Sequence, residues 1–161
     1  MSGKKLFKIV VTAIVARDGR FLVIQLPADH KKFPSRWSVP GGKLETDDYT
    51  NLPKDTPTYW YNVLERALRR EVQEETALEI KHVRYVTSLA DARENDDPSV
   101  VISCLADYAG GEVALEAGMQ AHQWVTLEES NSVDLIEGIH EELEIANRML
   151  KGEKPREWQS T

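Results

Sequence analysis

The acidic run from Arg70 to Glu75 constrains this chain more than any other segment. It reads Arg-Glu-Val-Gln-Glu-Glu and places three glutamates within five positions, namely Glu71, Glu74 and Glu75. Residues three or four apart are neighbours on an α-helix, so these carboxylates would share one helical surface. Like charges at that separation repel one another unless a cation lies between them. The run therefore indicates either a cation-binding helix or a surface helix whose charges are simply solvated.

Apolar residues upstream favour the first interpretation. They recur with a period near 3.6 and predict a helix from residue 57 to about residue 76; the positions are Trp60, Leu64, Ala67, Leu68 and Val72. Glu71 and Glu75 fall on or beside this apolar stripe, and not opposite to it. A carboxylate that faces a core is costly unless it is paired or binds a metal.

Two glycines upstream of the helix add a second element. Gly41 and Gly42 end the segment Trp-Ser-Val-Pro-Gly-Gly, and glycine allows the backbone to approach a ligand closely. Together with the acidic helix, they predict a hard divalent metal held near a phosphate group.

Size and composition predict one ordinary domain that spans residues 1–161. The chain is long enough to bury a core, and its contents of 41% hydrophobic and 29% charged residues are typical of a soluble globular protein. A net charge of −7 argues against nucleic acid as the main partner, because such binding needs a basic face. It leaves room for a small phosphorylated substrate, because a metal can supply positive charge locally.

The sequence predicts neither a membrane protein nor a secreted one. The apolar segment 9–16 follows two lysines, but Lys8 interrupts it and no cleavage site of small residues follows, so a strand explains it better. No apolar run approaches the roughly 20 residues that span a bilayer. The single cysteine, Cys104, lies in an apolar run and predicts a buried thiol without an internal disulfide, which fits a cytoplasmic protein.

The remaining patterns predict the α+β fold class, a mixed β-sheet flanked by helices. Strands are expected at residues 8–17, 21–26, 37–39, 83–89, 100–108, 112–115 and 122–127. Residues 46–57 have little periodicity and predict a surface loop, with Thr56 as the N-cap of the following helix and Pro57 as its first residue. A last helix is expected to begin after Ser132 or Asp134, either of which would be its cap, and to run to about residue 150.

These motifs resemble the Nudix hydrolase family. The family box reads G-x5-E-x7-R-E-U-x-E-E-x-G-U, where U is a bulky aliphatic residue. Gly42 would open this box and residues 70–78 would close it, and the segments 37–42 and 124–129 are also similar to family elements. The resemblance covers roughly residues 6–150 and implies the α/β/α sandwich of that family.

The chain departs from the family pattern in its box. Asp48 stands six residues after Gly42, where the family has Glu, and about 14 extra residues lie between Glu45 and Asn62. The usual first glutamate of the box is therefore absent or relocated.

Two further departures concern single positions. Ala77 stands where the family has Gly, and we expect ordinary helical geometry there, because lengthening the helix by one residue absorbs an alanine easily. Gln25 and Leu26 stand where relatives that clean up oxidised nucleotides often have Arg, which leaves the substrate class open.

The resemblance implies roles for the acidic residues. Glu71, Glu74 and Glu75 would hold Mg²⁺, or alternatively Mn²⁺, with help from the Gly41 carbonyl. Arg70 would orient these acids by ion pairing. The carboxylate that activates water, as a general base, would be that of Glu71 or Glu116, and Glu116 is equally interpreted as a surface residue.

Substrate contacts are less sharply indicated. Lys43 is a candidate phosphate contact or an ordinary exposed lysine, and Trp37 is a candidate for the base pocket or a core residue. The aromatic residues 59–61 would stack on a base, pack within the protein or form a dimer contact.

The resemblance implies a Mg²⁺-dependent hydrolase of a nucleoside diphosphate linked to another group. A nucleoside triphosphate is favoured, because relatives that act on ADP-ribose commonly have Pro about 16 residues past the box, where this chain has Glu94. ADP-ribose, a nucleotide sugar and a catalytically silent nucleotide-binding role are the alternatives. The expected partner is a small nucleotide and neither nucleic acid nor a membrane, and a homodimer remains open.

Overall fold

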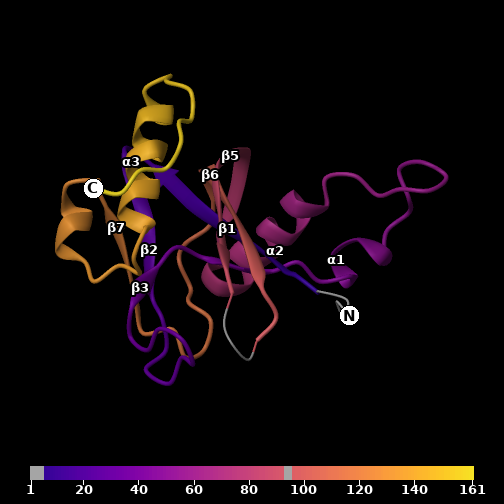
Figure 1. Cartoon of the computed structure of the whole chain (residues 1–161), viewed down its shortest axis with the longest axis horizontal. Coiled ribbons are helices and arrows are strands. Elements are labelled where there is room, and N and C mark those ends of the chain that lie inside the picture. The colour runs from indigo at the N-terminus through magenta and orange to yellow at the C-terminus, as the bar shows by residue number, and fades with distance from the viewer. Residues whose placement is uncertain (1–5, 93–95) are drawn as a thin grey trace.

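A seven-stranded sheet forms the centre of the protein, shown in Figure 1 as a computed structural model that describes residues 6–92 and 96–161. The strands are β1 (Lys8–Arg17), β2 (Arg20–Gln25), β3 (Trp37–Ser38), β4 (Gly41–Lys43), β5 (Glu79–Asp91), β6 (Ser99–Gly110) and β7 (Ala121–Val125). Their order is β3-β2-β1-β6-β5, while β4 pairs with β1 and β7 pairs with β2. Because β1 and β6 are parallel and the other pairs are antiparallel, the sheet is mixed, as predicted. Position 94, which bears on the ADP-ribose comparison, lies outside the described residues.

Three helices and one 3₁₀ turn complete the fold. They are α1 (Asp47–Thr50), α2 (Val63–Thr76), the 3₁₀ turn η1 (Glu129–Ser132) and α3 (Ile139–Leu150). Helix α2 packs with strand residues Val11 and Val15 in one apolar cluster, and α3 packs with Ile14 and Phe21 in another. Side chains alternate between the two faces of a strand, so the two long helices cover opposite faces of the sheet. The predicted α+β class, with a helix on each face, is confirmed.

Two predicted helix starts are wrong. Helix α2 begins at Val63 and not at residue 57, because Thr56 accepts hydrogen bonds from the N–H groups of Thr58 and Tyr59 at 3.2 and 2.9 Å and so closes a local turn. Helix α3 begins at Ile139, after Gly138 with φ of 89°, and not near residues 132–134, where η1 ends. The predicted loop at 46–57 also contains helix α1.

The predicted strand at 112–115 is likewise wrong. The N–H groups of Ala114 and Glu116 donate to the carbonyls of Thr76 and Glu75, each at 3.0 Å. The last carbonyls of a helix lack partners within the helix, so this segment satisfies two of them instead of joining the sheet.

Ala77 has left-handed geometry, which corrects the expectation of ordinary helical geometry. Its φ is 62° and its ψ is 14°, and its N–H still donates to the Gln73 carbonyl at 2.9 Å. Strand β5 begins two residues later at Glu79, so the chain must leave the helix axis at once. A left-handed residue after the last helical turn makes that reversal.

The predicted burial of the single cysteine is confirmed. Cys104 is buried in β6, and burial raises the pKa of its thiol to about 11. Among the residues that the structure describes, none belongs to a helix long and apolar enough to cross a bilayer.

Candidate active site

Glu75 is a buried acid at the end of helix α2. It lies in the last turn of α2 with only 6% of its surface exposed, and the Gly41 N–H of strand β4 donates to its Oε1 at 3.0 Å. Burial raises the pKa of Glu75 to about 8, although the Gly41 N–H opposes the shift; the neighbouring charges that raise it further are Glu71, Glu116 and Glu74. A cation beside Glu75 would relieve this cost of burying a carboxylate among other acids.

Gly42 lets Glu71 approach the sheet. A Cβ at position 42 would lie 2.2 Å from the Glu71 Cδ and 2.3 Å from its Oε2, so any side chain there would displace this carboxylate. A Cβ on Gly41 would lie 2.4 Å from the Val11 carbonyl oxygen of β1. The absence of side chains at these two glycines therefore brings helix α2 and strand β1 against β4, while the predicted approach to a ligand stays a prediction.

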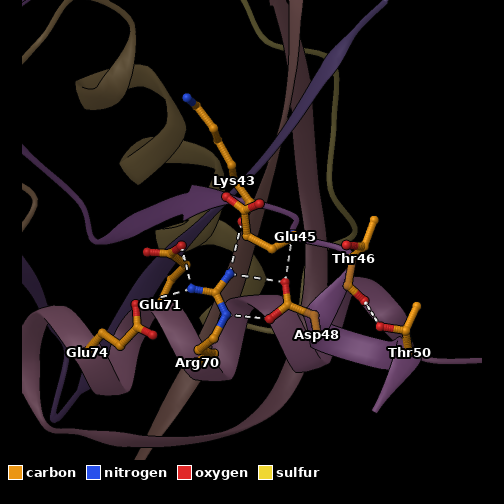
Figure 2. Close-up of polar contacts among 8 residues, drawn as sticks. All are labelled: Lys43, Glu45, Thr46, Asp48, Thr50, Arg70, Glu71 and Glu74. Atoms are coloured by element: carbon orange, nitrogen blue, oxygen red, sulfur yellow. Dashed lines mark hydrogen bonds and ion pairs between the residues drawn. The ribbon is translucent and has the colours of Figure 1, made fainter. Parts of the chain in front are cut away.

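Arg70 ties two of the acids to the start of the insertion, as Figure 2 shows. Its Nη1 donates to Glu71 Oε1 at 2.8 Å and to Glu74 Oε2 at 3.1 Å. Its Nη2 donates to the Lys43 carbonyl and to Asp48 Oδ2, both at 3.0 Å, and its Nε pairs with the other oxygen of Asp48. The guanidinium thus fixes the orientation of Glu71 and Glu74 on α2.

Asp48 is a site residue to which the sequence interpretation gave no role. Its side chain is 2% exposed, and besides Arg70 it accepts the Glu45 N–H at 2.8 Å. The hydrogen bond from Arg70 holds the pKa of Asp48 below its usual value. Because Asp48 occupies the position at which the family box has Glu, the extra residues lie between Asp48 and α2. The spacing of six residues from Gly42 was the available signal.

Three other predicted residues lie at different distances from this network. Glu116 is close, because its N–H donates to the Glu75 carbonyl and its charge raises the pKa of Glu75. Lys43 is exposed, and its side chain extends away from Arg70 in Figure 2. Trp37 is half-buried in β3, where its backbone N–H donates to the Asp134 carbonyl at 3.0 Å and its carbonyl accepts the Ile136 N–H at 2.9 Å.

The aromatic residues of the insertion divide into one packed residue and two exposed ones. The Trp60 Nε1 donates to the Leu52 carbonyl at 2.8 Å, and its ring lies 5.3 Å from that of Tyr49. Tyr59 and Tyr61 are exposed. Trp60 therefore stabilises the insertion from within.

The acids have the right chemistry for a hard divalent ion, because carboxylate and carbonyl oxygens are the ligands that Mg²⁺ prefers. In the described part of the chain, no three acidic, histidine or cysteine side chains converge closely enough to hold a metal. Glu71 and Glu74 both contact Arg70, so both would have to turn to share an ion with Glu75. The buried carboxylate of Glu75 and its acidic neighbours fit such an ion once those two side chains turn.

Comparisons with known proteins give this arrangement a family. The model described as the NUDIX domain matches residues 6–144. The nucleoside triphosphatase NudI of Enterobacter sp. (strain 638) is 29% identical over an alignment of 140 residues, and the match covers 80% of this chain and 88% of that protein.

Solved structures agree on the fold. The Escherichia coli ORF135 protein has a TM-score of 0.64 and 26% identity, covering 95% of this chain and 96% of its own. An ADP-ribose pyrophosphatase from Streptococcus suis 89-1591 has a TM-score of 0.64 and 20% identity, covering 92% and 96%, and this likeness shows the fold alone. The family match over most of the sequence shows that this chain belongs to the NUDIX family and is an enzyme of the Nudix hydrolase type.

Proposed function

We propose that this enzyme hydrolyses a phosphoanhydride bond of a nucleoside triphosphate with the help of Mg²⁺. The observation that carries the proposal is the buried Glu75 carboxylate, held by the Gly41 N–H beside Glu71 and Glu116. The name of the relative NudI, a nucleoside triphosphatase, supports this choice of substrate.

The metal ligands in this proposal are Glu71, Glu74, Glu75 and the Gly41 carbonyl. A divalent ion bound there would neutralise phosphate charge and make a bound water more acidic. Arg70 contributes by orienting Glu71 and Glu74, which it contacts at 2.8 and 3.1 Å.

Either of two acids, Glu71 or Glu116, is proposed to accept the proton of the attacking water. The Glu71 carboxylate already accepts a hydrogen bond from Arg70, and burial raises its pKa. Glu116 lies on the loop that contacts the end of α2, with its N–H 3.0 Å from the Glu75 carbonyl. A general base with a raised pKa suits catalysis near neutral pH, which favours Glu71.

Lys43 and Trp37 complete the proposal as substrate contacts. The exposed Lys43 ammonium follows Gly42 directly and is free to swing toward a phosphate, while its carbonyl stays bound to Arg70. Trp37, half-buried in β3, is proposed as a contact for the base.

A panel of nucleotides tests the proposal. Purified enzyme is incubated with nucleoside triphosphates, ADP-ribose and nucleotide sugars across a Mg²⁺ titration, and released phosphate and pyrophosphate are measured. We expect Mg²⁺-dependent turnover that is fastest with a triphosphate. Faster turnover of ADP-ribose or a nucleotide sugar would assign the enzyme to that substrate class instead. No turnover of any compound, together with retained nucleotide binding, would indicate a binding protein.

Glu75→Gln tests the metal assignment in the same assay. The variant keeps the size of the side chain but loses an anionic ligand, so turnover should fall at least about tenfold. Glu65→Gln is the matched control, because Glu65 lies exposed in the first turn of the same helix. Normal turnover of Glu75→Gln at saturating Mg²⁺ would refute the assignment.

A further inference from the structure

A second cavity lies between strand β5 and helix α3, on the face of the sheet opposite α2. Its volume is about 430 Å³, within the usual range for small-molecule sites. Its walls are the end of β5, the start of α3 and the C-terminal tail, which turns back beside α3 after Leu150 (Figure 1). None of the acids proposed for catalysis lines it.

The tail closes one side of this cavity with Trp158. The indole Nε1 donates to the Gly138 carbonyl at 3.1 Å, and the Thr161 Oγ1 donates to Glu141 Oε1 at 3.0 Å. The polar edge of the indole is therefore satisfied within the protein. Trp158 nevertheless keeps 39% of its surface exposed, which leaves part of the ring available to a ligand.

The charge of the cavity is wholly negative. Glu137, Glu141 and Glu142 line it, and none of the described lining residues is a lysine or arginine. The remaining walls include Leu89 and the indole of Trp158, so the lining combines acidic groups with apolar surface. A ligand that matches both features carries a positive charge on an apolar body.

Glu142 gives the second, independent indication of a ligand. It is 6% exposed and still reaches the cavity, and burial raises the pKa of its carboxyl. The Ser103 hydroxyl opposes this rise in pKa, and the charge of Glu141 adds to it. The Ser103 Oγ nevertheless finds no partner with hydrogen-bond geometry among the described residues. A buried carboxylate is costly without a full partner, and a cationic ligand would supply one.

A metal ion fits this cavity poorly. The described acidic side chains form no group close enough to coordinate a metal. Several carboxylates around a partly apolar space suit an organic cation better, and an indole face attracts ammonium and guanidinium groups.

We infer that the cavity between β5, α3 and Trp158 binds an organic cation, namely an ammonium or guanidinium group on an apolar stem. Glu142 contacts the charge at the buried end, and Trp158 covers the stem. The cation comes either from a free amine or from an arginine side chain of another protein.

Titration of the 161-residue protein with agmatine tests the inference. Binding is measured by calorimetry and by amide chemical shifts, with 1,4-butanediol as an uncharged probe. We expect saturable agmatine shifts at residues 87–89 and 137–142 and none with the diol. Glu142→Gln should raise the agmatine Kd at least about tenfold and Trp158→Ala about fivefold.

Matched variants and a second probe complete the experiment. Glu112→Gln repeats the Glu-to-Gln change, and Tyr59→Ala likewise removes an aromatic ring; both lie at exposed positions outside the cavity and should leave the Kd unchanged. A blocked Gly-Arg-Gly peptide that binds more tightly than agmatine would identify a protein side chain as the source, and weaker binding would identify a free amine. Absence of saturable shifts at 10 mM agmatine, or equal Kd values for folded Glu142→Gln and the wild type, would overturn the inference.

Discussion

Replacing Ala77 with glycine should stabilise the protein. Ala77 has φ of 62° and ψ of 14°, directly after the last residue of α2. An L-residue in this left-handed region is strained by about 1–2 kcal/mol, whereas glycine adopts it freely. Glycine gives the unfolded chain more conformational entropy, which costs about 0.4–1 kcal/mol. The free energy of unfolding should therefore rise by roughly 0.5–1 kcal/mol.

Urea denaturation of both proteins without metal measures this difference through the transition midpoint at constant slope. A gain of 1 kcal/mol would also raise the Tm by about 2–4 °C for a chain of this length. Ala90→Gly is the matched control, because Ala90 is exposed in strand β5 and should lose stability on the same substitution. A lower midpoint for Ala77→Gly than for the wild type would refute the reasoning.

Three further predictions follow from the same region. Without metal, the free energy of unfolding should fall by roughly 3 to 5 kcal/mol as pH rises from about 4.5 to about 8, because the folded state keeps a proton on Glu75 that the unfolded state loses. Glu75→Gln should remove this fall. A persistent fall in that variant would contradict the assignment. Asp48→Ala should lower the free energy of unfolding by about 1–3 kcal/mol in urea, because Arg70 loses its buried partner, while Asp47→Ala at an exposed site should not; equal losses would be the contrary result. Replacing residues 53–58 with two glycines should keep the Tm within a few degrees of the wild-type value, because the free energy of unfolding depends only weakly on loop length. The same change should alter the nucleotide preference. Unfolding with an unchanged preference would show that the segment is structural.

Patterns repeated along the chain predicted the fold well. The strands expected at residues 8–17 and 21–26 form a hairpin, and the turn residues Asp18 and Gly19 between them have the positive φ that such a turn needs. The apolar period of α2 placed Glu75 toward the core, where it is buried. Such patterns depend only on residues close together in the sequence, and the fold buries the residues that they predict to be buried.

Features decided by distant residues were missed. Thr56 has the chemistry of an N-cap, yet it closes a turn within the insertion, and no periodicity marks Val63 as the start of α2. Residues 112–115 alternate as a strand does, but their amides bond to the end of α2, which is far away in sequence. The contact between Asp48 and Arg70 was likewise hidden, because the insertion separates them by 22 positions.

The parallel pairing of β1 with β6 also sets an order of events during synthesis. The β1 residues from Lys8 to Ala16 pair with residues far along the chain, from Ser99 to Asp107. While the ribosome produces the intervening chain, including all of α2, one edge of β1 stays without its final partner. An unpaired apolar edge favours association between chains, and non-local pairing slows folding. The acids of α2 are therefore synthesised while β1 still lacks its β6 partner.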